Sequence, residues 1–224
     1  KEKQRVGVNF TDDDLRKELA ELEGYYELAK RIVVNTKGEE LIRALQKLFE
    51  NAKSKDWPQK AVVFTESTRT QEYLAGLLEK AGISYTQFNG SNNSSQAREA
   101  CESWRKEFPE AASVGSYSAN VRQALINNFK KNSQVFLTTE AGAEGLNLQF
   151  CNIVINYDLP WNPTRIMQRV GRINRVGTEF DRIYVHNFFP TAQSKRQMPL
   201  EERILEKLQA FHDTLGEDIK YLSD

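Results

Sequence analysis

The sequence lacks the features of a secreted, membrane-spanning or strongly basic protein. Only two of its 224 residues are cysteine, and Cys101 and Cys151 lie too far apart to suggest a disulfide framework, which fits a reducing cytoplasm. No apolar run approaches the roughly 20 residues that a helix needs to span a bilayer, and residues 1–10 contain no apolar signal region. Lysine plus arginine equals aspartate plus glutamate, at 31 each, so a nucleic-acid site would require local clustering of charge. We expect a cytoplasmic protein without membrane contact.

Several catalytic signatures are also missing. The two histidines, His186 and His212, have no companions at metal-ligand spacing, so no metal site is expected. The sequence has no Gly-x-Ser-x-Gly elbow, no Gly-x-Gly-x-x-Gly fingerprint and no Gly-x4-Gly-Lys-Ser/Thr loop to hold the β- and γ-phosphates of a nucleotide. An Asp-Glu-x-His/Asp box is absent too. Because the first residue is Lys1 rather than Met, we expect further sequence upstream.

What the sequence does contain is an alternation of predicted strands and helices from about residue 60 onward. A short apolar run at 61–65 is typical of a strand buried on both faces, and further strands are predicted at 83–88, 135–138, 152–156 and 182–188. Helices are predicted at 68–81, near 95–107, and at 119–131 and 163–175. Gly82 is expected to end the first of them. This order predicts an α/β fold in which helices cover both faces of a parallel β-sheet. Because such sheets bind ligands at the carboxyl ends of their strands, candidate site loops follow Thr65, Phe88, Thr139 and Tyr157.

Helical additions are predicted at both ends of the chain. A helix begins near Thr11, which can act as its cap, and carries apolar residues at helical spacing. A second helix follows Thr36-x-x-Glu39, which has the spacing of a capping box. A last helix is predicted at about 199–215. We therefore predict a helical protrusion or linker at 1–35, a main domain at 36–190 with an insertion at about 91–120, and a helical extension at 191–224.

The strongest functional signal is the segment from Asp158 to Gly177. Asn162 and Pro163 predict the start of a helix. Four arginines follow at steps of four, three and three residues, which predicts that they share one broad face of the helix: Arg165, Arg169, Arg172 and Arg175. A separate apolar stripe that can face the sheet consists of Ile166, Val170 and Ile173. No acidic residue occurs between positions 159 and 178. We expect this row to meet an anion from elsewhere, a triphosphate or a nucleic-acid backbone; a solvated helix face is the alternative.

The string Gln-x-x-Gly-Arg-x-x-Arg resembles motif VI of superfamily-two helicases. The preceding Asp-x-Pro-Trp-Asn-Pro resembles the Swi/Snf-type and bacterial RNA-polymerase-recycling ATPases. The resemblance covers about 60–190 and implies a RecA-like domain, the second lobe of a two-lobe motor. It further implies that Arg172 and Arg175 act as arginine fingers on the γ-phosphate of ATP held by the first lobe, and that Gln168 belongs to the nucleotide site.

The segment from Leu137 to Gln149 resembles motif V of the same helicases. By this resemblance, Thr138 and Thr139 contact the nucleic-acid backbone, while Gly145 and Asn147 lie near the ribose of ATP. The DEAD-box relatives have Asp where this chain has Asn147, so the ribose contact departs from their pattern. An ordinary connection between two strands is the alternative, in which Glu144 could pair with one of the arginines.

The segments Val62–Thr68 and Phe88-Asn89-Gly90 resemble motifs IV and IVa. The resemblance implies that Thr65, Ser67, Asn89 and Gly90 hold phosphates of the nucleic acid, although the hydroxyls after the first strand are equally suited to cap a helix. The family continues into an Arg-x6-Phe helix, here assigned to Arg122 through Phe129, and this chain inserts about thirty residues before it. Trp104 in the insertion is expected to be core.

Taken together, these motifs predict the second motor lobe of an ATP-dependent double-stranded-DNA translocase or helicase. Its partners would be double-stranded DNA and an upstream RecA-like lobe, which would bind ATP and Mg²⁺, and a protein partner could dock on the insertion or the terminal helices. The isolated chain is expected to be inactive. The alternatives are a non-catalytic nucleic-acid or protein docking module and an RNA helicase lobe; Trp161-Asn162-Pro163 and Gln168, where DEAD-box proteins have His, count against the latter.

Overall fold

The computed structural model describes residues 11–31, 35–140, 145–160, 162, 164–174, 178 and 180–189. The chain divides into two compact units, residues 1–39 and 40–224, which are described separately. None of the described helices is long and apolar enough to cross a membrane. The predicted helix at 199–215 and the boundary at residue 191 lie outside the described residues.

The first unit is built around helix α1 (Asp12–Lys30). Its start is a reciprocal cap, as the sequence predicted for Thr11: the Thr11 hydroxyl accepts from the Asp14 N–H at 3.2 Å, and the Asp14 carboxylate accepts from the Thr11 N–H at 3.1 Å. The Thr11 hydroxyl also donates to the Asp14 carboxylate at 2.5 Å, and this bond, followed by the bond from the Thr11 N–H, lowers the pKa of Asp14. The apolar side chains of the helix are exposed, and they are Leu15, Leu19, Leu22, Tyr25, Tyr26 and Leu28.

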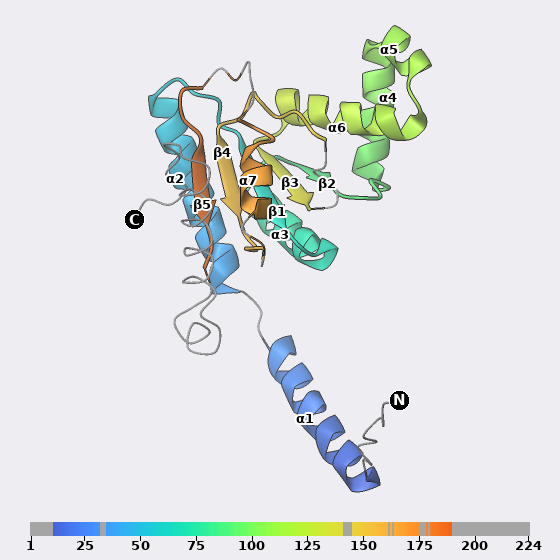
Figure 1. Cartoon of the computed structure of the whole chain (residues 1–224), viewed down its shortest axis with the longest axis vertical. Coiled ribbons are helices and arrows are strands. Elements are labelled where there is room, and N and C mark those ends of the chain that lie inside the picture. The colour runs from blue at the N-terminus through green and yellow to red at the C-terminus, as the bar shows by residue number, and fades with distance from the viewer. Residues whose placement is uncertain are drawn as a thin grey trace, which may run out of the picture. The chain divides into compact units, whose positions relative to one another are not determined.

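The second unit is organised by a sheet of five parallel strands in the order β2-β3-β1-β4-β5 (Figure 1). The strands are β1 (Ala61–Thr65), β2 (Tyr85–Phe88), β3 (Val135–Thr139), β4 (Ile153–Asn156) and β5 (Tyr184–Asn187). β1 and β3 are buried at every position, as expected of strands covered on both faces. The predicted α/β fold with a parallel sheet is confirmed.

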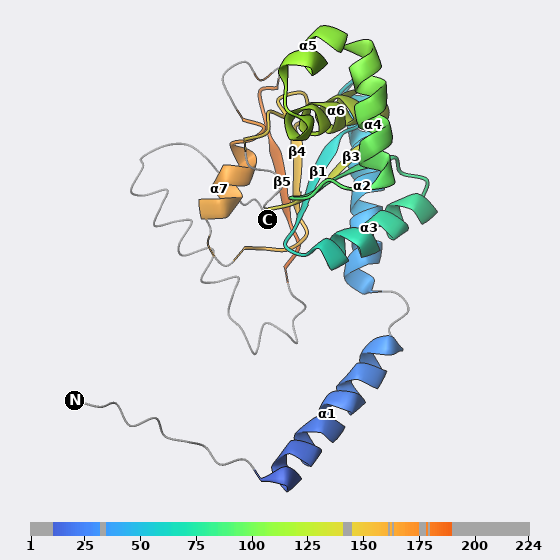
Figure 2. The same cartoon turned by 90° about the vertical axis from the view of Figure 1, so that its right-hand side faces the viewer.

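Two hydrophobic cores cover the two faces of the sheet. Alternate residues of β1 face each of them: Ala61 and Val63 belong to the core with α2 (Thr36–Ser54) and α3 (Thr68–Lys80). Val62 and Phe64 belong to the opposite core, with α4 (Ser95–Glu107) and α6 (Tyr117–Asn132). Helix α7 (Thr164–Val170) lies on the other side of the strands from α3 (Figure 2).

Local capping explains where several helices start and stop. The predicted stop at Gly82 is confirmed: this glycine has φ 69°, its N–H bonds to the Glu79 carbonyl at 3.1 Å, and the Ile83 N–H bonds to the Leu78 carbonyl at 3.0 Å. The start of α2 differs from the prediction, because the side-chain oxygen of Asn35 accepts from the Lys37 N–H at 2.9 Å. Asn35, rather than Thr36, therefore caps this helix.

The insertion folds as a helical extension of the main domain. It comprises α4, the short helix α5 (Pro109–Val114) and the start of α6. Helix α5 was not predicted, since its six residues are too few to show a period. Trp104 is only 9% exposed and belongs to the core with α6, which confirms the prediction for this residue.

The end of α2 is a Schellman motif that positions Trp57. The N–H groups of Asp56 and Trp57 bond to the carbonyls of Lys53 and Ala52, at 3.2 and 2.9 Å. The left-handed position of the motif, usually glycine, is Asp56, with φ 55°. An L-residue with a side chain is disfavoured in this conformation, and an acid also lies unfavourably at a helix C-terminus.

We therefore expect Asp56→Gly to stabilise the protein by about 0.5–1 kcal/mol, because glycine adopts this conformation without steric cost. Asp56→Ala is the matched control, since it removes the same charge but keeps a Cβ. Urea unfolding of the three proteins measures the effect. An Ala variant at least as stable as the Gly variant would contradict it.

Candidate functional site

The sheet brings the predicted site segments to one edge. Thr65 at the end of β1 is in register with Thr139 at the end of β3, and Phe88 of β2 is in register with Thr138. On the other side of β1, Phe64 is in register with Asn156 at the end of β4. The loops that follow Thr65, Phe88, Thr139 and Tyr157 thus leave the sheet at the same carboxyl edge, where parallel sheets bind ligands.

The centre of this edge is the side chain of Arg169, which is 1% exposed. Its Nε and Nη2 donate to Glu140 Oε2 at 2.7 and 2.5 Å. Its Nη1 donates to Asn156 Oδ1 at 2.8 Å and to the Asp158 carbonyl at 3.0 Å. The guanidinium also lies 4.9 Å from the centre of the Phe64 ring. One buried cation therefore connects α7 to the ends of β1, β3 and β4.

The prediction of a single basic face is wrong for Arg169. Counting from Ile166, positions 169, 170 and 173 fall at the i+3, i+4 and i+7 spacing of one helix face, and Arg169 is buried with Ile166, Val170 and Ile173 while Arg165 is exposed. The anion that pairs with Arg169 is the carboxylate of Glu140 and not a ligand. Glu140 lies outside the acid-free stretch from 159 to 178, so the local sequence does not reveal this pair. The apolar stripe itself is confirmed as buried.

Arg172 lies in a turn after α7, because this helix ends at Val170 and not near 175 as predicted. The chain tightens there, with the Arg172 N–H bonding to the Arg169 carbonyl at 3.1 Å and the Ile173 N–H to the Val170 carbonyl at 2.9 Å. The Arg172 carbonyl then accepts from the Leu148 N–H at 3.1 Å. The motif VI turn is thus fixed from both sides. Arg175 lies outside the described residues.

The start of α7 follows the sequence signal at Asn162. The Asn162 side-chain oxygen accepts from the Thr164 N–H at 3.1 Å and from the Thr164 hydroxyl at 2.8 Å. The chain leading to this cap is held against β1, where the Asp158 carboxylate accepts from the Thr65 hydroxyl at 2.6 Å and from the Glu66 N–H at 3.2 Å. These bonds bridge segments more than ninety residues apart.

The predicted nucleic-acid residues differ in their exposure. Thr65 and Thr138 are fully buried and Thr139 is 5% exposed; the Thr138 hydroxyl donates to the Thr139 carbonyl at 3.0 Å. Ser67 is exposed and caps α3 by accepting from the Arg69 N–H at 3.1 Å. Ser67, Asn89 and Gly90 are therefore the accessible members of the set.

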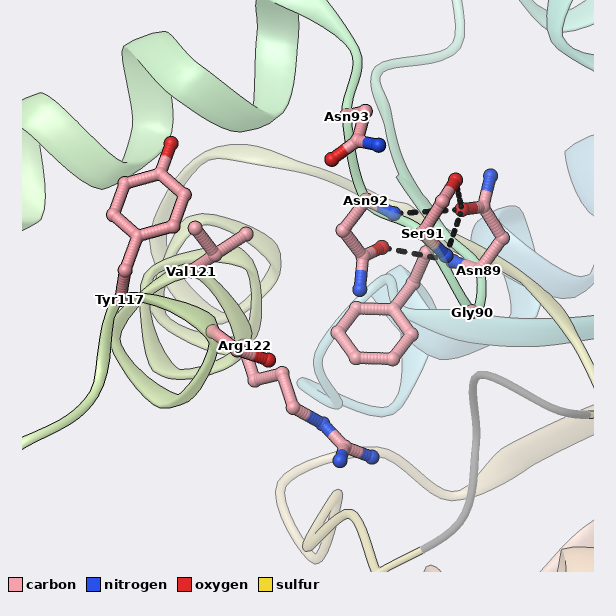
Figure 3. Close-up of a pocket in the computed structure, with 10 residues that line it drawn as sticks. Asn89, Gly90, Ser91, Asn92, Asn93, Tyr117, Val121 and Arg122 are labelled. Atoms are coloured by element: carbon pink, nitrogen blue, oxygen red, sulfur yellow. Dashed lines mark hydrogen bonds between the residues drawn. The ribbon is translucent and has the colours of Figure 1, made fainter.

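A cleft of about 190 Å³ lies between the loop Asn89–Asn93 and the first turns of α6 (Figure 3). Asn89 organises this loop: its side-chain oxygen accepts from the N–H groups of Ser91 and Asn92 at 3.1 and 2.9 Å. Across the cleft, the side chain of Arg122 extends from α6 and its guanidinium lies 5.8 Å from the Phe88 ring centre. The walls therefore combine amides and a cation, which suits phosphate oxygens.

A buried glutamine outside the set of predicted site residues supports this loop. Gln71 of α3 is 1% exposed, and its amide nitrogen donates to the Phe88 and Leu137 carbonyls at 2.9 and 2.8 Å. Its oxygen accepts from the Asn89 amide at 3.1 Å. Gln71 thus satisfies the ends of β2 and β3 and orients Asn89. The sequence feature that could have identified Gln71 is its position as a polar residue on the buried face of the helix predicted at 68–81.

The residues predicted for the nucleotide are on the surface of the same region. Gly145 is exposed with φ 77°, a conformation that only glycine adopts readily. Asn147 is exposed and its amide donates to the Gln149 side chain at 3.1 Å. Gln168, on α7, is exposed as well. Glu144, the predicted partner of an arginine, lies outside the described residues.

The described residues of this edge suit anion binding rather than acid–base or nucleophilic catalysis. Burial raises the pKa of the Tyr157 phenol to about 12, with smaller contributions from Tyr73 and Asp158. At the opposite, amino-terminal end of the strands, burial raises the pKa of the Cys151 thiol to about 12, so both groups stay protonated at neutral pH. Within the described part of the chain, no cluster of His, Cys, Asp or Glu could hold a metal ion.

Residues 40–177, which include this whole edge, match the helicase conserved C-terminal domain. The chain belongs to this family. The resemblance to the second RecA-like lobe of superfamily-two helicases is confirmed, and the helicase C-terminal domain of this chain carries its motif V and VI segments at the carboxyl edge of the sheet.

Curated relatives agree with the family. The ATP-dependent helicase YqhH of Bacillus subtilis, itself uncharacterised, is 35% identical over 188 residues, which are 79% of this chain and 28% of that protein. The RNA polymerase-associated protein RapA of Vibrio vulnificus is 40% identical over 82 residues, or 37% of this chain and 8% of that protein. The chain thus spans less than a third of the length of these relatives.

Solved structures support the fold of the helicase C-terminal domain. The C-terminal part of the Fun30 ATPase domain superposes with a TM-score of 0.50 and 19% identity, covering 88% of this chain and 63% of that one. The C-terminal domain of the DEAD-box protein Dbp5 also has a TM-score of 0.50, with 22% identity and coverage of 82% and 80%.

We expect Glu140→Ala to destabilise this domain by about 2–3 kcal/mol, because it removes the carboxylate that pairs with the buried guanidinium of Arg169. Glu140 itself is partly exposed, which keeps the loss below that of a fully buried pair. Guanidinium chloride unfolding measures it. Glu72→Ala, at an exposed position of α3, is the control, and equal losses in the two variants would contradict the assignment.

Proposed function

We propose that this chain is the second motor lobe of an ATP-dependent double-stranded-DNA translocase. The family assignment and the names of the relatives, ATP-dependent helicases among them, support this function. The observation that carries it is a contrast between neighbouring arginines. All three guanidinium nitrogens of Arg169 donate hydrogen bonds within the domain, whereas the side chain of Arg172, a partly buried residue at the same edge, has no hydrogen-bond or ion-pair partner among the described residues.

An unpaired guanidinium on a fixed turn is suited to an anion supplied from outside the domain. In the proposed function, this anion is the γ-phosphate of ATP, which an upstream RecA-like lobe would hold together with Mg²⁺. Arg172 and Arg175 would stabilise the charge that develops on the transferring phosphoryl group. Gln168, Gly145 and Asn147 would contact the rest of the nucleotide from the exposed surface nearby.

The nucleic-acid backbone would cross the neighbouring part of the edge. Ser67 and Gly90 are exposed there and Asn89 is partly exposed, and phosphate contacts from such residues position a strand without reading its sequence. The hydroxyls of Thr65 and Thr138 are occupied within the chain, so these residues and Thr139 would contribute through the backbone at the strand ends. The insertion and the terminal helices remain the proposed surfaces for a protein partner.

In the full-length protein, Arg172→Ala or Arg175→Ala should lower DNA-stimulated ATP turnover by roughly 10³-fold or more while DNA binding is kept. Arg105→Ala, an exposed arginine of α4 away from the edge, is the control and should turn over ATP normally. Steady-state phosphate release and a DNA-binding titration measure the two properties. Unchanged turnover in both finger variants would instead support a docking module, and stimulation by RNA in place of duplex DNA would support an RNA helicase lobe.

The 224-residue chain alone should bind ATP feebly and hydrolyse none, because it has no phosphate-binding loop. Isothermal titration with ATP and Mg²⁺, together with a phosphate-release assay at high protein concentration, tests this expectation. Robust hydrolysis that survives in the Arg172→Ala variant would place the active site elsewhere.

A further inference from the structure

A groove of about 590 Å³ lies beside β2, at the end of the sheet away from β5, and its volume is within the range of ligand sites. Its walls are the start of β2, one face of α4 and one face of α6 (Figure 1). The α4 residues that line it recur at helical spacing and are Gln96, Ala100, Ser103 and Glu107. The groove shares no lining residue with the cleft beside Asn89–Asn93, so it is a separate surface.

The strand wall of this groove has backbone groups that face outward. β2 is an edge strand, because among the described strands it pairs only with β3. The Ser84 carbonyl accepts from the Val135 N–H at 3.0 Å, so the backbone groups of Ser84 and of every second residue after it face β3. Tyr85 and Gln87 therefore direct their N–H and C=O groups away from the sheet, and Tyr85 lines the groove. Such an edge is a template for a further strand.

The groove carries more negative than positive charge. Its carboxylates are those of Glu79, Glu99 and Glu107, and Lys131, the one cation among the described residues that line it, pairs with Glu107. The exposed carboxylates of Glu79 and Glu99 have no hydrogen-bond or ion-pair partner among the described residues. Burial and, to a smaller extent, the nearby charge of Glu79 raise the pKa of the Tyr85 phenol. These charges repel a nucleic-acid backbone and complement a cationic occupant.

We propose that this groove binds an extended segment of a partner protein that carries lysine or arginine and adds a strand to β2. Its backbone would bond with the outward groups of Tyr85 and Gln87, and its cations would pair with Glu79 and Glu99. A second copy of this chain does not suit the groove, because β2 is Tyr-Thr-Gln-Phe and would bring no cation. The proposal goes beyond the motor function, since this binding needs neither ATP nor DNA, and it gives the insertion a partner of stated chemistry.

Selection of binders to the 224-residue chain from a displayed library of random ten-residue peptides tests the proposal. We expect the selected peptides to be enriched in lysine or arginine and to bind less tightly as salt is raised. N-methylation of one of the two alternate sets of backbone amides in the best binder should weaken binding at least about tenfold, because an added strand donates from one set. No binder, no enrichment in basic residues, or no loss with either methylated set would overturn the proposal.

Variants of the chain locate the bound peptide. Glu79→Gln combined with Glu99→Gln should weaken the best binder about tenfold, because two ion pairs are lost. The matched control combines Glu72→Gln with Glu102→Gln, which are exposed acids of the same two helices outside the groove, and should bind normally. Gln87→Pro should bind more weakly than Gln87→Ala, because proline removes an outward N–H and leaves the bonds to β3 in place.

Fluorescence anisotropy of the labelled peptide measures these affinities, and the melting temperature of each variant shows that the fold is kept. The exposed glutamates decide the outcome should Gln87→Pro unfold. Arg172→Ala should bind the peptide normally, so this proposal and the motor function can fail separately. Normal binding by the variant that lacks Glu79 and Glu99 would overturn the proposal. A dimer of the chain in sedimentation that Gln87→Pro abolishes would assign the edge to a second copy and overturn it as well.

Discussion

The carboxyl edge of this domain depends on the buried guanidinium of Arg169. A charge removed from water is costly unless it is paired and hydrogen-bonded, and here Glu140, Asn156 and the Asp158 carbonyl together accept from all three guanidinium nitrogens. Because these acceptors end three different segments, the same ion pair fixes β3, β4 and the loop after β4 relative to α7. A displacement of any one segment would leave a buried donor unpaired, so the edge is held in one arrangement.

Adjacent arginines thus have different tasks on one short segment. The Arg169 guanidinium makes hydrogen bonds within the domain that hold α7 to the sheet. The turn that follows α7 is held in addition by the hydrogen bond from the Leu148 N–H to the Arg172 carbonyl. This leaves the Arg172 guanidinium placed but unpaired within the described part of the chain, which is the condition for an arginine finger in the proposed motor.

Features that depend on neighbouring residues could be predicted from the sequence. The order of the strands and helices, the end of a helix at Gly82, and the buried stripe of Ile166, Val170 and Ile173 are of this kind. The sequence was insufficient where partners are distant: Glu140 pairs with a residue 29 positions away, and Asp158 with Thr65 across 93. Arg169 shows the difference, because its i+3 position already lay within the buried stripe, but only the fold supplies the carboxylate that allows an arginine there. The short helix α5 could not be predicted, because one and a half helical turns are too few to show a hydrophobic period.

The most direct test is a double-mutant cycle on ATP turnover in the full-length protein, with Glu140→Gln and Arg172→Ala. If Glu140 acts by holding Arg169 and hence the turn that carries Arg172, Glu140→Gln alone lowers turnover, and adding it to Arg172→Ala lowers turnover no further. This non-additivity is the expected result. Independent effects that multiply in the double variant, or full turnover in Glu140→Gln, would contradict it.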